Sequence, residues 1–300
     1  MTTSGLTQGW VAKRLPARPP RAHKGTFGRL LIVAGSLEYA GAALLSGLAA
    51  IRAGVGVACL ATPEAVGMRL LGLVPELTAM LLVEEAPGLT APAGWRRLAT
   101  EAPAYDALVV GPGLGRQPAT LRRARSFINE LRHPAVVDAD GLVALADVQR
   151  WWSAIKAPVV LTPHPGEFAR LMRLPAGQSL ADDDAQRAEA ARQAATTWGQ
   201  VVVLKGAHTV IAAPNGDLLR SAITTPALAT AGSGDVLAGV IGAFLAGGLS
   251  PFDAAGCGVA VHGAAGLLAE DRIGRAGVVA RDIADLLPTA IEQLRDGRRS

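Results

Sequence analysis

The chain has 300 residues, of which 50% are hydrophobic and 18% charged, and its formal net charge at pH 7 is +4. Only 4% of the residues are aromatic while 35 are glycine, a composition that disfavours an aromatic-cored β-sandwich and favours helices packed on a sheet through small side chains. The longest uncharged stretch, residues 236–252, is shorter than the roughly 20 residues that span a membrane, and the scattered Lys and Arg residues lack the interleaved aromatic residues of a nucleic-acid interface.

Short β-branched runs alternate along the chain with longer Ala-rich segments. This alternation predicts βαβ units, and therefore an α/β fold with a central, mostly parallel sheet. The predicted strands cover residues 29–34, 55–60, 107–110, 135–138, 158–161, 201–204 and 208–212.

The Ala-rich segments between and after these strands predict helices. In the helix expected from residue 181, Ser179 is predicted as the N-cap with Asp182 at position N3, and the acids that follow complement the helix dipole rather than bind metal. The predicted helices cover residues 40–53, 118–132, 181–198, 234–247, 252–269 and 279–294.

No change in composition and no Ser/Gly-rich linker divides the chain. We therefore expect a basic N-terminal arm over residues 1–24 and a single catalytic domain over residues 25–300. The arm has no apolar segment typical of a secretory signal, although a transit peptide stays open. Cys59 and Cys257 are far apart and form no disulfide framework, which favours a reducing, cytoplasmic location.

Most predicted strands end in a loop of Gly, Pro and polar residues. In an open parallel sheet, ligands bind outside the carboxyl ends of the strands, so we expect the active site at the edge where these loops gather. Each loop alone is also explained as an ordinary tight βα turn. The loops begin at Gly35, Gly111, Asp138, Thr162 and Lys205.

The sharpest motif is Thr230-Ala231-Gly232-Ser233-Gly234-Asp235, directly before an uncharged predicted helix. Small residues at a helix start leave its free N–H groups open to a phosphate. Asp235 is explained equally by helix capping, but an acid beside a phosphate site also suits a general base that takes a proton from an attacking hydroxyl. The motif therefore predicts an anion hole, with Asp235 either as a helix cap or as a general base.

Other polar residues at the strand ends allow two interpretations each. Lys205 and the residues after it form a connection able to cover an adenine nucleotide, or Lys205 simply reaches solvent. His164 is presented by a stiff loop between two prolines, although a lone His is usually structural. Because side chains alternate along a strand, Asp138 and Asp140 are expected to point the same way. They then form a carboxylate pair, or one of them accepts hydrogen bonds from loop amides. Gly111–Gly115 does not fit the dinucleotide-binding spacing G-x-G-x-x-G.

Taken together, these motifs are similar to those of the ADP- or ATP-dependent NAD(P)H-hydrate dehydratases, which belong to the ribokinase-like superfamily. The resemblance covers nearly the whole chain. It implies a central sheet with helices on both faces, and a lyase that phosphorylates the hydroxyl of the (S) hydrate of NADH or NADPH and then eliminates phosphate. The motifs that carry it lie at residues 24–29, 35–42, 111–115, 138–140, 162–167, 205–209 and 229–235.

The resemblance also implies roles for individual residues. Asp235 would be the catalytic base. The hydrated dinucleotide would contact Ala42, Gly113, His164 and Asp235. The nucleotide, ADP or ATP, would contact Lys205, Gly206, Ala207, His208, Thr209, Gly232, Ser233 and Gly234.

The same resemblance implies Mg²⁺ on the nucleotide phosphates, held by Glu167 through water and with no direct protein ligand predicted. It further implies a homo-oligomer, a tetramer, and a separate NAD(P)H-hydrate epimerase as pathway partner. The chain departs from the family in having Thr225-Pro226 for Asn-Pro and Ala231-Gly232 for Gly-Gly, which affects contacts in that loop.

Three other functions compete with this interpretation. A vitamin-precursor or sugar kinase of the same fold would keep the anion hole and Asp235 but would release a stable phosphorylated product. An NAD-dependent oxidoreductase would need a strand-linked G-x-G-x-x-G with an acid about 20 residues further on, which is not visible. A non-catalytic nucleotide-binding module would lose nothing on Asp235→Ala.

Overall fold

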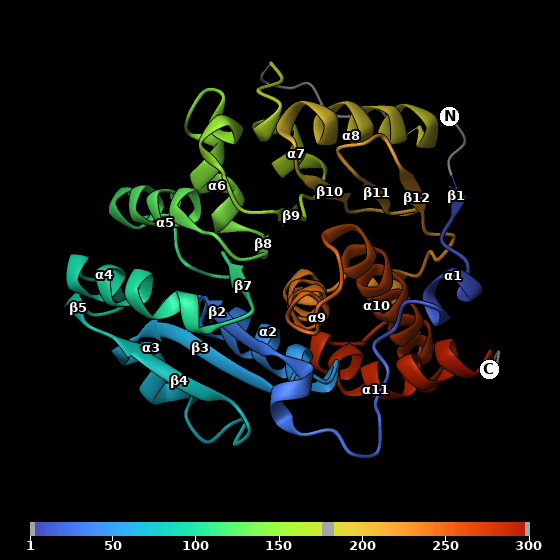
Figure 1. Cartoon of the computed structure of the whole chain (residues 1–300), viewed down its shortest axis with the longest axis horizontal. Coiled ribbons are helices and arrows are strands. Elements are labelled where there is room, and N and C mark those ends of the chain that lie inside the picture. Colours follow the sequence, from blue (N-terminus) through green and yellow to red (C-terminus); the bar gives the residue numbers. More distant parts are fainter. Residues whose placement is uncertain (1–3, 176–182, 298–300) are drawn as a thin grey trace.

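The computed structural model describes residues 4–175 and 183–297 and shows one ten-stranded sheet between two layers of helices (Figure 1). The order across the sheet is β1-β12-β11-β10-β9-β8-β7-β2-β3-β4. The strands are β1 (Ser4–Gly5), β2 (Arg29–Val33), β3 (Val57–Pro63), β4 (Thr78–Leu82), β7 (Ala107–Val110), β8 (Ala135–Val137), β9 (Val159–Leu161), β10 (Val201–Leu204), β11 (Val210–Ala212) and β12 (Leu218–Arg220).

Neighbouring strands of this sheet are parallel except where β11 pairs with β10 and with β12. The predicted mostly parallel sheet is thus confirmed, and β11 is its antiparallel strand. Two short strands, β5 (Glu84–Ala86) and β6 (Leu89–Thr90), form a separate antiparallel ribbon.

The helices divide into two layers. One face of the sheet is covered by α1 (Gln8–Ala12), α2 (Ala40–Arg52), α3 (Glu64–Leu70), α9 (Ser233–Ala246), α10 (Pro251–Ile273) and α11 (Ala280–Asp296). The other face is covered by α4 (Pro92–Glu101), α5 (Pro118–Glu130), α6 (Asp140–Ala146), α7 (Pro165–Leu171) and α8 (Asp184–Trp198). Short 3-10 helices lie at Lys24–Phe27, Ala102–Ala104, Trp151–Ala154 and Pro226–Leu228.

Strand β2 shows why the sheet needs both layers. Its side chains alternate between faces, so Leu30 and Ile32 enter one core while Leu31 and Val33 enter the other. Each of these four side chains is at most 1% exposed. A strand buried on both faces is expected to read as a continuous apolar run, which is how it appears in the sequence.

Small residues allow the helices to approach closely, as the composition predicts. An added Cβ on Gly239 of α9 would lie 2.2 Å from the backbone oxygen of Ser46 in α2. Helix α9 is surrounded by α2, α10, α11 and the sheet, which explains why it carries no charge after its first turn. By length and composition, helix α10 is apolar enough to span a membrane. However, 78% of its apolar 18-residue stretch is buried inside the protein, as in a core helix.

Every strand and helix predicted above is present; β7 and β10 have the predicted ends, and the ends of the others are shifted. The strand expected from His208 begins at Val210, because residues 206–209 form the turn before it. The helix expected from residue 181 begins at Asp184, and its N-cap is Asp183, which accepts a hydrogen bond from the Gln186 N–H. The predicted cap Ser179 and its partner Asp182 lie outside the described residues.

Several short elements are missing from the sequence-based prediction. They lack a clear period because they are only a few residues long, or because a proline opens them, as in α4 and α7. These elements are β1, α1, α3, β4, β5, β6, α4, α6, α7 and β12.

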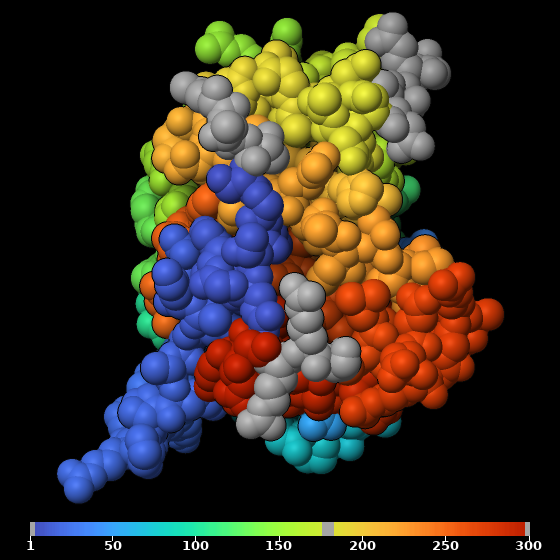
Figure 2. Space-filling model, turned by 90° about the vertical axis from the view of Figure 1, so that its right-hand side faces the viewer, coloured from blue at the N-terminus to red at the C-terminus, as the bar shows by residue number. Residues whose placement is uncertain are grey.

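The predicted N-terminal arm contributes to the body of the protein. Strand β1 pairs in parallel with β12, and Val11 of α1 is buried. The Gln8 side-chain amide donates to the backbone oxygen of Gln293 at 3.0 Å. Figure 2 shows this N-terminal segment, in blue, lying beside the red C-terminal helix α11.

Candidate active site

The site lies where the order of strands in the sheet reverses direction. From β2 the chain continues outward through β3 and β4, whereas from β7 it continues the opposite way through β8, β9 and β10. The loops after β2 and β7 meet at this point, where the Gly35 N–H donates to the Pro112 oxygen at 2.9 Å. A crevice at such a switch point is the usual ligand site of an open α/β sheet, as predicted from the strand-end loops.

The loop after β7 packs directly on the start of α2. Gly113 has φ +60°, and a Cβ there would come within 2.6 Å of the Tyr39 oxygen and 3.0 Å of the Ala42 Cβ. Only glycine fits this position without moving the backbone. The structure therefore brings together Ala42 and Gly113, two of the four residues expected to contact the dinucleotide.

Helix α9 packs against α2 and begins with an open N-terminus. Gly232 is the N-cap residue at φ +86° and provides no side chain, so the first N–H groups of the helix have no side-chain cap. The hydroxyl of Ser233 lies 3.1 Å from Nε2 of His262 in α10. Burial lowers the pKa of His262 to about 4, so this buried ring is neutral and fixes the Ser233 hydroxyl without adding charge.

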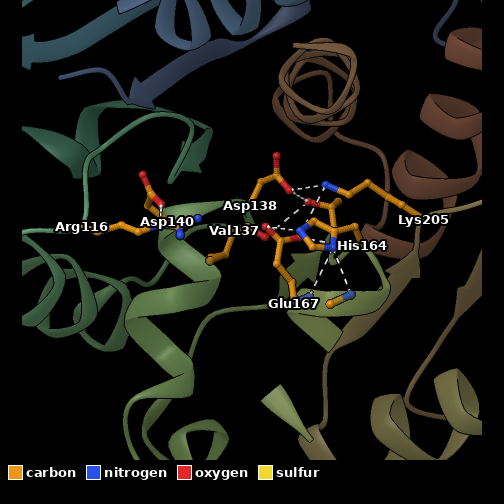
Figure 3. Close-up of polar contacts among 9 residues, drawn as sticks. Arg116, Val137, Asp138, Asp140, His164, Glu167 and Lys205 are labelled. Carbon is orange, nitrogen blue, oxygen red and sulfur yellow. Dashed lines mark hydrogen bonds and ion pairs between the residues drawn. The ribbon is translucent and has the colours of Figure 1, made fainter. Parts of the chain in front are cut away.

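A lysine lies next to that helix N-terminus. An added Cβ on Gly234 would be 3.3 Å from Nζ of Lys205. Lys205 is the residue directly after strand β10. Lys205 Nζ donates to Asp138 Oδ1 at 2.8 Å and lies 3.9 Å from Glu167 Oε2 (Figure 3). Asp138 Oδ1 also accepts from the Thr162 hydroxyl at 2.7 Å. Side chains following β8, β9 and β10 thus converge on one point.

The charges of Lys205, Asp138 and Glu167 change the pKa values within this cluster. Burial favours neutral lysine, but the carboxylates of Asp138 and Glu167 outweigh burial and raise the pKa of Lys205. Burial, with a smaller contribution from Asp138, raises the pKa of Glu167 although Lys205 opposes the shift. At neutral pH, Lys205 is therefore a fixed cation whose charge is already shared between two carboxylates.

Asp235, in the first turn of α9, is the titratable group of the site with the clearest functional character. Burial, followed by the negative charge of Asp138, raises the pKa of Asp235 to about 7. No hydrogen bond or ion pair joins its carboxylate to another described side chain. A carboxylate with a pKa near neutrality and free oxygens is suited to accept a proton at physiological pH.

A cavity of about 700 Å³ opens beside Lys205 and the start of α9. Its lining joins the β10–β11 connection, the loop before α9 and the buried face of α10. Among the residues predicted for ligand contact, those that line it are His164, Lys205, Gly206, Ala207, Thr209, Ser233 and Gly234.

Two histidines predicted for ligand contact have distinct positions. His164 caps α7: its Nδ1 accepts from the Gly166 N–H at 3.0 Å, and its ring, 57% exposed, lies at the cavity wall. His208 turns to the start of α8, where its Nδ1 is 2.8 Å from Asp184 Oδ2. The side chain of His208 is thus directed to α8, and it is not among the residues that line the cavity.

The β10–β11 connection is held from behind by α8. The Arg187 side chain donates to the Lys205 oxygen at 3.0 Å, and a Cβ on Gly206 would lie 2.5 Å from the same Arg187 nitrogen. Arg187 is buried, and nothing in the sequence distinguishes it from the other arginines of a polar helix. Arg187 is therefore a supporting residue of the site that could not be predicted from the amino-acid sequence.

Asp138 and Asp140 do not point the same way, contrary to the expected alternation. Strand β8 ends at Val137, and Ala139 has φ +48°, so the chain turns between the two acids. Asp138 faces Lys205, while Asp140 accepts from the Gly115 N–H at 2.9 Å and from Arg116 Nε at 3.0 Å. Of the two predicted alternatives, a bond to loop amides is confirmed for Asp140.

Comparison with known proteins places the chain in a family. A family model described as NAD(P)H-hydrate dehydratase matches residues 30–289. The crystal structure of an ADP/ATP-dependent NAD(P)H-hydrate dehydratase from Bacillus subtilis, co-crystallised with ATP and Mg²⁺, superposes with a TM-score of 0.82 at 33% identity, covering 98% of this chain and 99% of that chain. A ribokinase-like superfamily protein from Enterococcus faecalis, 24% identical with a TM-score of 0.79 over 97% of this chain and 96% of that one, shows the same fold.

Longer proteins match as well. The bifunctional NAD(P)H-hydrate repair enzyme Nnr of Moorella thermoacetica is 40% identical over 97% of this chain and 54% of its own length. The chain thus spans about half the length of that curated relative. With the family model matching residues 30–289, the chain belongs to the NAD(P)H-hydrate dehydratase family and has its ribokinase-like fold.

Proposed function

We propose that the protein is an ADP- or ATP-dependent (S)-NAD(P)H-hydrate dehydratase that restores NADH or NADPH from the hydrated dinucleotide. The single observation that carries the proposal is Asp235, a carboxylate with a pKa of about 7 in the first turn of α9, beside an open helix N-terminus and the Lys205 ammonium. A curated relative from Bacillus subtilis, 34% identical over 95% of its length, bears the name ADP-dependent (S)-NAD(P)H-hydrate dehydratase.

The nucleotide belongs in the cavity lined by the β10–β11 connection and the loop before α9. We assign to it Lys205, Gly206, Ala207, His208 and Thr209, of which His208 would act through its backbone because its side chain pairs with Asp184. The terminal phosphate is expected at Gly232, Ser233 and Gly234, where a helix start without a side-chain cap and the helix dipole favour an anion.

The hydrated nicotinamide is expected at the switch point, against Ala42 and Gly113, with His164 and Asp235 on the side of the nucleotide. There Asp235 accepts the proton of the ring hydroxyl while that oxygen attacks the terminal phosphorus, and the bond from phosphorus to the remaining nucleotide breaks. Phosphate then leaves with the electron pair of its carbon–oxygen bond, and loss of a proton from the adjacent carbon restores the double bond. Phosphate is a far better leaving group than hydroxide.

The residues of the site also fit Mg²⁺, which when bound with the nucleotide would offset phosphate charge. Asp138, Glu167 and Asp235 are three carboxylates around one lysine, and mutual repulsion contributes to the raised pKa of Glu167 and of Asp235. Among residues 4–175 and 183–297 no cluster of three or more His, Cys, Asp or Glu side chains could hold a metal alone. Mg²⁺ commonly relies on one or two carboxylates plus substrate phosphates, and Glu167 is the carboxylate proposed to hold it through water.

Further parts of the proposal concern the context of the enzyme. We expect a homo-oligomer, a tetramer, in the cytoplasm, and a catalytic domain over residues 25–300 with residues 1–24 as an N-terminal arm. We also propose an NAD(P)H-hydrate epimerase as the pathway partner of this activity.

The test is incubation of the protein with the hydrate of NADH or NADPH and with ADP or ATP. We expect the reduced-nicotinamide absorbance to return, with one phosphate released per dinucleotide restored. Repair at full rate without nucleotide would contradict the mechanism. A stable phosphorylated product in place of the reduced dinucleotide would indicate a small-molecule kinase of the same fold.

A further inference from the structure

Arg116 occupies a distinctive place in the site. It directly follows the Gly111–Gly115 loop, and its Nε donates to Asp140 Oδ1 at 3.0 Å. The Asp140 side chain is only 8% exposed, and its second oxygen accepts from the Gly115 N–H at 2.9 Å. A buried carboxylate with two partners therefore fixes both the loop and the base of the guanidinium.

The outer part of the same guanidinium is free. The Arg116 side chain is 64% exposed, and its two Nη groups make no hydrogen bond to any other described residue. Asp140 first, and then Tyr39 and Glu167, raise the pKa of Arg116. Figure 3 shows the Arg116–Asp140 pair across the site from Lys205.

The charges of the other residues of the proposed site make this cation significant. Lys205 is already paired with Asp138 at 2.8 Å and lies close to Glu167, at the nucleotide side. Ala42 and Gly113 provide no charge, and Asp235 is acidic. A dinucleotide substrate carries at least two phosphate charges, so these neighbours leave Arg116 as the exposed cation able to meet them.

We infer that Arg116 binds a phosphate group of the hydrated dinucleotide through its free Nη donors, and that Asp140 positions it for this contact. The inference rests on the proposed function. A planar guanidinium presents two parallel donors to phosphate oxygens, and fixing its base on Asp140 lowers the entropy lost on binding. The phosphate is the pyrophosphate shared by both substrates or the 2′-phosphate of the NADPH hydrate, and the two substrates distinguish these sources.

The experiment compares Arg116→Ala, Arg116→Lys and the control Arg122→Ala, which removes the same charge from an exposed position of α5. We expect Arg116→Ala to raise KM for the hydrate about tenfold or more, equivalent to ~1.4 kcal/mol, with kcat and KM for ADP nearly unchanged. Arg116→Lys keeps a charge without the planar fork, and its KM should lie between those of wild type and Arg116→Ala.

Each outcome has a defined meaning. An equal rise in KM for both hydrates supports a contact with the pyrophosphate, and a rise for the NADPH hydrate alone supports one with the 2′-phosphate. An unchanged KM for both hydrates in folded Arg116→Ala, or the same rise in Arg122→Ala, overturns the inference. Wild-type protein is assayed first, because a lack of repair there contradicts the proposed function, whereas normal repair with an unaffected variant contradicts only the role of Arg116.

Discussion

Among single residues, Asp235 has a pKa that is set by its surroundings in the site. Its pKa of about 7 arises first from burial and then from the charge of Asp138, with Lys205 opposing. A side chain that only capped α9 would gain by staying ionised, because a carboxylate is favourable at a helix N-terminus. The environment instead makes ionisation costly, which is typical of a catalytic base.

Asp235→Asn tests the assignment directly. The amide keeps the size of the side chain but cannot accept the hydroxyl proton, so turnover should fall by roughly 10² to 10⁴, the usual contribution of a positioned general base. Nucleotide affinity should hold or rise slightly, because a negative charge near the phosphate is removed. Steady-state kinetics and nucleotide titration measure both. Normal turnover by the folded variant would contradict the role of Asp235 as a base and would leave it only a helix-capping role.

The raised pKa also predicts a pH dependence. A general base must be ionised, so kcat should rise with pH through about 7 and then level off. Stability should move the opposite way: a carboxyl whose pKa is higher when folded than when unfolded stabilises the fold at low pH and loses this effect as pH rises through about 7. Wild type should therefore lose stability relative to Asp235→Asn between pH 4 and pH 8, as measured by denaturation at each pH. A constant difference would contradict the raised pKa.

The Asp138–Lys205 pair gives a prediction of stability. Asp138 is 2% exposed in its side chain and Lys205 21%, so Lys205→Met leaves a buried carboxylate without its ammonium. We expect a loss of about 3 to 5 kcal/mol in the free energy of unfolding. The double variant Asp138→Asn with Lys205→Met should recover part of that loss in urea denaturation. A cost below about 1 kcal/mol would show that the pair behaves as an exposed one.

At the scale of elements, the start of α9 combines an open N-terminus with tight packing from behind. Gly232 at φ +86° lies against α2 and the start of α11, where an added Cβ would meet Leu45 Cδ1 at 2.5 Å and Ala280 Cβ at 3.1 Å. The loop proposed to bind phosphate is therefore fixed by helix packing, so that its N–H groups keep their direction before a ligand arrives.

Gly232→Ala tests this packing, with Gly199→Ala as its matched control. Gly199 also has a left-handed backbone at φ +67°, but an added Cβ there meets nothing within 4 Å. The control should cost about 1 kcal/mol from backbone strain alone and leave the nucleotide KM unchanged. Gly232→Ala should destabilise more and raise the nucleotide KM, since the loop must move. Equal effects of the two variants in denaturation and kinetics would contradict the argument.

At the scale of the whole molecule, the chain closes on itself at the edge of the sheet away from the switch point. Strand β1 covers the edge of β12, and Arg14 pairs with Asp253 at 2.7 Å while its guanidinium lies over Trp10. Trp10 also packs edge-on against Phe252. An exposed sheet edge invites pairing with other chains, and the N-terminal segment prevents it.

Deletion of residues 1–12 should therefore lower stability more than activity. It removes the buried Val11, worth about 1.5 to 3 kcal/mol of apolar burial, and uncovers the edge of β12. We expect a lower Tm and concentration-dependent aggregation, with kcat nearly unchanged at temperatures where the protein is folded. Deletion of residues 1–3, which keeps β1 and α1, is the control. A large loss of kcat without loss of stability would place the segment in the active site.

The longer strands and helices, and the edge of the sheet that carries the proposed site, could be predicted from the amino-acid sequence. Short apolar runs such as Val201–Leu204 are typical of strands buried between helix layers, and the strand-end loops of a parallel sheet gather at one edge. The motif from Gly232 to Asp235 likewise predicted an open helix start with an acid, because glycine and small residues act locally on the backbone.

Which side chains meet at this edge depends on the order of the strands across the sheet. Lys205 and Asp138 are 67 positions apart in the sequence, and they touch because β8, β9 and β10 are neighbours in the sheet, an order that no local pattern contains. The pairing of Arg116 with Asp140, opposite to Lys205, required the turn at Ala139 that separates the two acids. The raised pKa of Asp235 could not be predicted from the amino-acid sequence for the same reason. It depends on burial and on charges that distant parts of the chain bring together.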